Sequence, residues 1–428
     1  MADGYFPAWR VKAAGTVAPD ERPPWGAAVA LGAQHVVAMF GATVLAPLLM
    51  GFDPNVAILM SGVGTLLFFV ITGGRVPSYL GSSFAFIGVV IAATGYGGHG
   101  LNAALPVALG GIVACGVAYA AIGLVVMATG TGWIERLMPP VVTGAVVAVI
   151  GLNLAPVAVR SAQGSTFDAA MALVTVLCIA LIAVYSRGRV RRLPILLGLV
   201  LAYAIDVVAT NVMGLGKPVD FGPVAAAAWL GMPAFTTPAW SGEAMTLIVP
   251  VAIVLVAENL GHIKAVSAMT GRNLDPLLGR AFLGDGVATI VSGMSGGTGV
   301  TTYAENIGVM AVTRIFSTVV FVIAALVALV LGFSPKFGAL IGTTPAPVLA
   351  GVSLVVFGLI AIAGARIWVQ NRVDFANNRN LVVAAAILTL GAGDFSLRFG
   401  TFTLGGIGTA TFGGILLYAI LAPARAPD

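Results

Sequence analysis

Apolar segments long enough to cross a membrane recur along almost the whole chain, and they restrict the possible folds more than any other feature. Windows of about 19 residues place seven of them in the first half, near 26–49, 55–72, 85–98, 103–128, 138–159, 168–185 and 193–213. Seven more follow near 245–266, 279–297, 303–313, 315–333, 338–364, 380–393 and 402–422. Only 9% of the residues are charged, against about 25% in soluble domains. The sequence therefore predicts an all-α polytopic membrane protein with 14 transmembrane segments.

Lys and Arg residues gather on alternate sides of these segments. If the N-terminus is cytoplasmic, 17 of the 21 face the cytoplasm, and the four that face outside are Arg160, Lys217, Lys336 and Arg398. The positive-inside rule describes this asymmetry, so both termini are predicted to be cytoplasmic, and the net charge of +5 indicates topology rather than a nucleic-acid partner. The predicted organisation is a cytoplasmic segment at 1–25, a seven-span repeat at 26–214, an external connection at 215–244, a second repeat at 245–422 and a cytoplasmic tail at 423–428.

The two halves carry related sequences. Residues 140–152 (PVVTGAVVAVIGL) align without gaps on 347–359 (PVLAGVSLVVFGL), with 6 of 13 positions identical, at an offset of 207. A second match joins 82–89 to 301–309 at an offset of 219. Because each repeat has seven spans, an odd number, the second repeat is predicted to be inverted relative to the first, as in many secondary transporters.

Two apolar segments are too short to cross the membrane as helices, namely 85–98 and 303–313. Each follows a stretch rich in Gly, Ser and Thr, 77–83 and 298–302, which is predicted to form a short strand ahead of a half-helix. Inverted symmetry would let the two strands pair near the midplane. The half-helices, beginning near Phe84 and Tyr303, would then point free N–H groups at a shared cavity. Such a cavity suits the carbonyl oxygens of a small polar ligand.

Four acidic residues fall within the predicted spans, namely Asp206, Glu258, Asp285 and Glu305. A carboxylate inside the membrane is costly, and it is a functional candidate by default. Glu305 begins the tenth-segment half-helix, and Glu258 shares a helix face with His262 four residues later, so that Glu258 and His262 could share or pass a proton. Asp285 could equally form a structural ion pair with Arg280. Asp206 has no partner visible in the sequence and could face either a helix interface or a lumen.

The run 305–314 (ENIGVMAVTR) resembles the signature of the nucleobase-ascorbate transporter family, also called nucleobase:cation symporter 2. Residues 34–35 (QH), 81–84 (GSSF) and 257–262 (AENLGH) resemble further motifs of its uracil permeases. The similarity covers nearly the whole chain and is greatest with the uracil permeases of bacterial pyrimidine-utilisation operons. It implies core and gate domains, a homodimer in the cytoplasmic (inner) membrane, and uptake of uracil with a proton as the coupling ion and no other cofactor or metal.

The same resemblance implies roles for particular residues. Glu258 and Glu305 would bind the N–H and carbonyl edges of the pyrimidine, and the backbone around Phe84, Tyr303 and Ala304 would complete the substrate-binding pocket. His262 would assist Glu258 in proton coupling. A supporting set comes from the same motifs, namely Gln34, His35, Thr302 and Asn306.

Other classes of membrane protein fit the residues less well. Three scattered histidines and two cysteines in apolar runs, Cys115 and Cys178, offer no metal cluster or nucleophile–base pair for an enzyme. A channel lacks support because the carboxylates are asymmetric between the two halves and no repeated selectivity loop appears, and an anion carrier would be expected to have a cation in place of Glu305. A xanthine or other purine transporter is the serious alternative. The resemblance favours a pyrimidine, since xanthine and urate transporters have Gln where this chain has Glu305.

Overall fold

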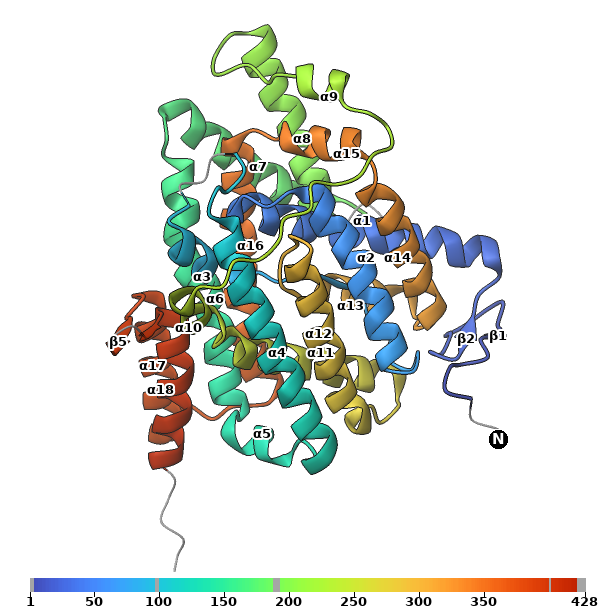
Figure 1. Ribbon diagram of the computed structural model, residues 1–428, viewed down its shortest axis with the longest axis vertical. Helices are drawn as coiled ribbons and strands as arrows, with labels where there is room; N and C mark the ends of the chain where they lie inside the picture. The colour runs from blue at the N-terminus through green and yellow to red at the C-terminus, as the bar shows by residue number, and fades with distance from the viewer. Residues whose placement is uncertain (1–3, 97–99, 188–192, 400–401, 422–428) are drawn as a thin grey trace, which may run out of the picture.

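The computed structural model describes residues 4–96, 100–187, 193–399 and 402–421, most of which lie in helices (Figure 1). The predicted tail at 423–428 lies outside these residues. Within the described ranges, 8 helices are long and apolar enough to span a membrane, or up to 9 if α14 and α15, which meet at an angle of 81°, count as one span. The chain is therefore a multi-pass membrane protein.

The elements of the first half are β1 (Arg10–Val11), β2 (Glu21–Arg22), α1 (Trp25–Met50), α2 (Pro54–Ile71), β3 (Leu80–Ser82), α3 (Ala85–Thr94), α4 (Leu105–Thr129), α5 (Gly132–Leu137), α6 (Pro140–Ala162), α7 (Thr166–Tyr185), α8 (Pro194–Val207), the π-helix η2 (Val208–Val212) and α9 (Gly222–Ala226). Those of the second half are α10 (Gly242–Ile248), α11 (Val251–Thr270), the 3₁₀ turn η3 (Asp275–Leu277), α12 (Leu278–Met294), β4 (Val300–Thr302), α13 (Ala304–Thr313), α14 (Thr318–Gly332), α15 (Pro335–Gly342), α16 (Ala346–Gln370), α17 (Asn378–Ala392), β5 (Leu397–Phe399), β6 (Phe402–Leu404) and α18 (Gly406–Ile420).

Each of the fourteen predicted apolar segments contains at least one helix, but several boundaries were wrong. The segment predicted at 338–364 is divided, because α15 ends at Gly342 and α16 begins after Pro345. Proline lacks an N–H and fits the start of a helix rather than its interior. The segment at 245–266 is divided at Pro250 between α10 and α11, and the segment at 402–422 begins with strand β6. Hydropathy alone does not register these breaks, since both sides of each break are apolar.

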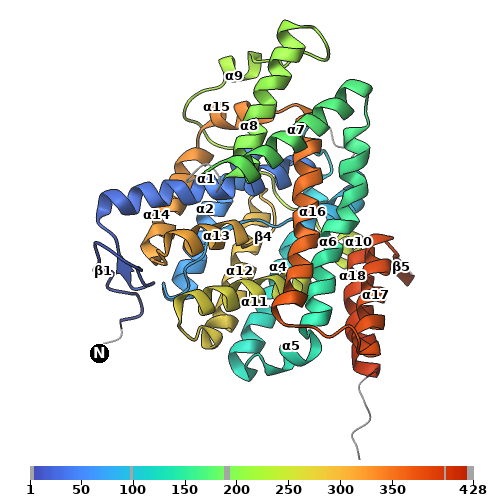
Figure 2. The ribbon, with the colours of Figure 1, turned by 180° about the vertical axis from the view of Figure 1, so that it is seen from behind.

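Helices from the two halves of the chain pack against one another through small residues. The most extensive contacts join α4 to α12, α6 to α16 and α2 to α14. Along α4 and α12 the backbones approach closely at Gly116, Gly123 and Gly286, where an added Cβ would lie 2.9, 2.5 and 2.4 Å from the partner helix. Small residues allow such close packing where no water drives helices together. Within this bundle, β4 and α13 lie in the middle, next to α12 and α1 (Figure 2).

The segment before α1 is fixed to the end of α13. Its backbone at Val17 donates to the Arg314 carbonyl at 3.0 Å and accepts from the Phe316 N–H at 2.8 Å. Asp20 forms an ion pair with Arg272 in the turn after α11. The N-terminal segment therefore joins the ends of the two helices, α11 and α13, that carry Glu258 and Glu305.

Glu21 helps to hold this segment at neutral pH. Its carboxylate accepts hydrogen bonds from the Ala18 backbone N–H and from the Lys12 ammonium, each at 2.9 Å. These two partners hold the pKa of Glu21 below its usual value. Because the folded-state pKa is lowered, the stabilisation is present above the usual pKa of a glutamate and is lost as the pH falls through the lowered value.

Candidate functional site

The two predicted strands pair at the centre of the molecule. β3 and β4 are antiparallel, with Leu80 opposite Thr302, Gly81 opposite Thr301 and Ser82 opposite Val300. Two further backbone bonds extend the crossing, from the Ser83 N–H to the Gly299 carbonyl at 2.9 Å and from the Tyr303 N–H to the Tyr79 carbonyl at 3.0 Å. The pairing satisfies backbone groups that would otherwise be unpartnered within the bilayer. The prediction of two strands that satisfy each other is confirmed.

A ten-residue helix follows each strand, α3 after β3 and α13 after β4. Neither N-cap residue, Phe84 or Tyr303, caps its helix with a side chain. Within the described part of the chain, the N–H groups of Phe84 and Ala304 also have no backbone acceptor. Free N–H groups at the positive end of a helix attract an electronegative ligand atom. The two half-helices thus leave at least one free donor at each start, including two of the positions predicted to bind substrate.

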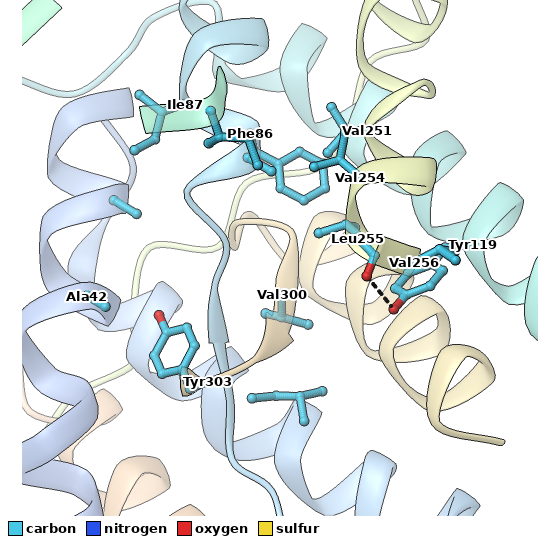
Figure 3. Packing of buried hydrophobic residues seen from close by; sticks show 14 of the residues in the cluster. Ala42, Phe86, Ile87, Tyr119, Val251, Val254, Leu255, Val256, Val300 and Tyr303 are labelled. Carbon is cyan, nitrogen blue, oxygen red and sulfur yellow. Dashed lines mark hydrogen bonds between the residues drawn. The ribbon is translucent and has the colours of Figure 1, made fainter. Parts of the chain in front are cut away.

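Tyr303 fixes the crossing from the inside. Its buried hydroxyl donates to the Ser82 carbonyl at 2.8 Å and accepts from the Thr43 hydroxyl at 3.1 Å. The ring points back towards β3 and α1 rather than into open space (Figure 3). Since its own N–H is bonded to Tyr79, Tyr303 positions the free N–H of Ala304 beside it.

Gly81 is a position where this arrangement leaves no room for a side chain. A Cβ there would lie 2.5 Å from the Tyr303 ring and 2.7 Å from the Thr43 hydroxyl. We expect Gly81→Ala to lower the free energy of unfolding by about 1–3 kcal/mol through overpacking, and to reduce transport. Thermal unfolding of the purified protein and uptake in cells measure both effects. Gly26→Ala, in α1 with open space around its Cβ, is the matched control; equal behaviour of the two variants would contradict the prediction.

Glu258 on α11 and Glu305 on α13 face the same region. Both are half-buried, and they lie close enough to interact electrostatically. Ala304, Gly308 and Gly261 beside them are exposed, and nothing lies within 4 Å of a Cβ added at either glycine. Small residues therefore leave an open space next to both carboxylates. Two like charges in a region of low dielectric repel each other, so a proton or a ligand N–H between them is favoured.

The predicted supporting residues are brought together in two pairs. His262 Nδ1 lies 2.9 Å from the Thr302 hydroxyl, and His35 Nδ1 lies 2.9 Å from the Asn306 amide nitrogen, which also donates to the His35 carbonyl at 3.1 Å. The expected pairing of His262 with Glu258 is replaced by the bond to Thr302, because β4 passes directly beside α11. Gln34 is half-buried on α1. His262 and His35 thus anchor the second strand and its half-helix.

Sequence reasoning missed a buried polar network beside Glu258. Asp285 Oδ2 accepts from the Asn259 amide at 2.6 Å and from the Tyr119 hydroxyl at 3.4 Å. The Tyr119 hydroxyl also lies 3.2 Å from the Leu255 carbonyl, as Figure 3 shows. The suggested ion pair of Asp285 with Arg280 is not formed; Arg280 lies over an aromatic ring of the N-terminal segment. Two signals were available, the intramembrane carboxylate of Asp285 and the position of Asn259 directly after Glu258.

Comparison with known proteins places the chain in a family. A sequence profile described as "Permease family" matches residues 26–398. The chain belongs to this family. A curated relative from Escherichia coli K12, named "Putative pyrimidine permease RutG", is 67% identical over 426 residues, or 99% of this chain and 96% of the relative. The "Uracil permease" of Bacillus caldolyticus is 42% identical over 418 residues, covering 94% of this chain and 93% of that protein. The chain is therefore a transporter and not an enzyme, as predicted.

Solved transporter structures share the fold. The transmembrane domain of the cyanobacterial bicarbonate transporter BicA has a TM-score of 0.62 at 16% identity, covering 92% of this chain and 97% of that chain. The murine Slc26a9 anion transporter, in its inward-facing state, has a TM-score of 0.64 at 13% identity, covering 92% of this chain and 68% of that chain. At these identities the likeness establishes a helical membrane-transporter fold and does not extend to the substrate.

Proposed function

We propose that the protein takes up uracil together with a proton by alternating access. The observation that carries this proposal is the meeting of two carboxylates, Glu258 and Glu305, with the starts of two half-helices next to open space. Relatives named as uracil and pyrimidine permeases, at 42% and 67% identity, support the substrate class.

The chemistry of uracil complements this site. Its ring carries alternating N–H donors and C=O acceptors. In the proposed complex ionised Glu305 accepts one ring N–H, because an ionised carboxylate is an acceptor only, and Glu258, which carries the coupling proton, accepts the other ring N–H through its carbonyl oxygen. The free N–H groups of Phe84 and Ala304 donate to the carbonyl oxygens, and the half-buried Phe84 ring lines the pocket. Tyr303 holds the backbone that presents Ala304.

Proton coupling is assigned to Glu258, with His262 assisting. A coupling group must favour substrate binding in one protonation state and change the preferred facing state with it. Glu258 interacts electrostatically with both Glu305 and Asp285, so its charge depends on whether a ligand separates it from Glu305. His262 bonds Thr302 on β4 and thereby links α11 to the strand crossing. Gln34, His35 and Asn306 support the same half-helix.

The proposed architecture has fourteen spans in two inverted repeats, at 26–214 and 245–422, joined by an external connection at 215–244. Helix contacts support this arrangement. The second, fourth, ninth and eleventh spans are α2, α4, α12 and α14. An inverted repeat exchanges the second span with the ninth and the fourth with the eleventh. Contact of α4 with α12 therefore requires contact of α14 with α2, and both contacts are among the most extensive. We further propose core and gate domains, a homodimer in the cytoplasmic membrane, and cytoplasmic termini at 1–25 and 423–428.

Substrate and coupling can be tested together in cells that express the protein. Uptake of labelled uracil is expected to exceed that of cells without the protein, and an uncoupler is expected to reduce accumulation to the control level. Unlabelled uracil at equal concentration should compete more strongly than xanthine, as expected from the relatives named as pyrimidine and uracil permeases. Stronger competition by xanthine would overturn the pyrimidine assignment in favour of a purine transporter.

A further inference from the structure

A polar cavity lies away from the strand crossing, where α7 begins and α8 ends. Its volume is about 660 Å³, and it is bounded by α7, α8 with η2, the chain at 217–220, α9, α15 and the start of α16. Figure 1 shows α8, α9 and α15 close together at this end of the molecule. In the proposed topology this end faces outside. Neither the substrate site nor the proposed coupling residues reach it.

Asp206 lines this cavity, and its carboxylate has no hydrogen-bond partner among the described residues. The residue is 1% exposed, and both carboxylate oxygens lack a hydrogen bond to any described residue. Protonation alone would not satisfy the Asp206 side chain, because a neutral carboxyl group adds a donor that also needs a partner. Buried carboxylates are normally paired, hydrogen-bonded or bound to a cation. The π-helix η2 begins two residues later and shifts the helix surface around the cavity.

The charge on the cavity wall favours a cation. Asp168 and Asp220 also line it, and Asp168 is close enough to Asp206 to interact with it electrostatically. The single basic residue in the lining is Lys217, which is exposed and forms no ion pair with these acids in the described chain. Three carboxylates and one ammonium leave an excess of two negative charges. A low-dielectric wall concentrates this field within the cavity.

We propose that this cavity binds one hydrated divalent cation, calcium or magnesium, between Asp206 and Asp168. No group of three acidic, histidine or cysteine side chains converges on one point in the described ranges, so a fully dehydrated cage is not available. Divalent cations held by one or two carboxylates keep several water ligands, and the cavity has room for them. The Thr210 hydroxyl, fixed to the Asp206 carbonyl at 2.8 Å, lies on the same wall. The cation joins the ends of α7 and α8.

Thermal unfolding of the purified full-length protein tests this site. After treatment with a chelator, calcium or magnesium chloride is expected to raise the unfolding midpoint by about 3 °C when the cation is at roughly 100 times its dissociation constant. Sodium chloride of equal ionic strength should have no such effect. Asp206→Asn removes the buried charge and should abolish the shift, while unfolding in chelator at a temperature equal to or above that of the unmodified protein.

Two further variants make the outcome decisive. Glu243→Gln changes an exposed acid on α10, outside the cavity, and should keep the full shift. Asp168→Asn should reduce the shift, which provides a second measurement if Asp206→Asn does not fold. No divalent shift in the unmodified protein, an equal shift with sodium, or a full shift in either aspartate variant would overturn the proposal. None of these results depends on uracil transport.

Discussion

Glu305→Gln is expected to reduce uracil uptake to the background of cells that lack the protein. Glu305 lies in the first turn of α13, half-buried and next to the free N–H of Ala304. Glutamine keeps the shape of the side chain but is neutral and carries donor hydrogens as well as an acceptor. Losing a hydrogen bond to a charged group costs about 1.5–3 kcal/mol, or roughly 10- to 150-fold in affinity. Binding of labelled uracil to the purified protein measures this loss directly.

The control for this prediction separates the site from general effects of charge. Glu243→Gln makes the same chemical change at an exposed position in the first turn of α10, and it should leave uptake unchanged. Thermal unfolding of Glu305→Gln should match that of the unmodified protein, since no described ion pair includes Glu305. If Glu305→Gln binds uracil within about twofold of the unmodified affinity, then Glu305 is not a substrate ligand.

The part of the site that the sequence could predict depends on short-range composition. Two Gly/Ser/Thr-rich stretches before short apolar segments indicated the strands that became β3 and β4, and inverted symmetry indicated that they would pair. A carboxylate at the start of a half-helix makes Glu305 a candidate without any knowledge of its neighbours, and its role stays a prediction. The prediction of paired strands succeeded because backbone groups inside a bilayer have so few ways to be satisfied.

The remaining features depend on which helices meet, and one sequence does not specify that. The network of Asp285, Asn259 and Tyr119 needs α12, α11 and α4 to pack together, and the three residues span 166 positions. His262 was predicted to interact with Glu258 on its own helix, but it bonds Thr302 on β4. Local spacing finds partners within one helix, whereas partners from another helix depend on the tertiary structure.

Glu258→Gln is expected to abolish uphill accumulation of uracil while leaving downhill movement. The variant keeps an acceptor oxygen in the site but can no longer gain or lose a proton, so substrate binding is no longer linked to protonation. With one proton per uracil, a gradient of one pH unit supports roughly tenfold accumulation. In vesicles with this gradient, the ratio of internal to external uracil should fall to about one in the variant.

Exchange at equal uracil concentrations distinguishes lost coupling from lost binding. Labelled uracil should still exchange through Glu258→Gln at saturating substrate, because exchange requires the change of facing state but no net proton movement. Glu305→Gln should fail in the same assay, since it lacks binding. The two variants are thus expected to behave differently in this assay, although the two glutamates face the same open space and interact electrostatically. If Glu258→Gln still concentrates uracil against its gradient, the coupling proton is carried by another group, and His262, which bonds β4 at Thr302, is the next residue to replace.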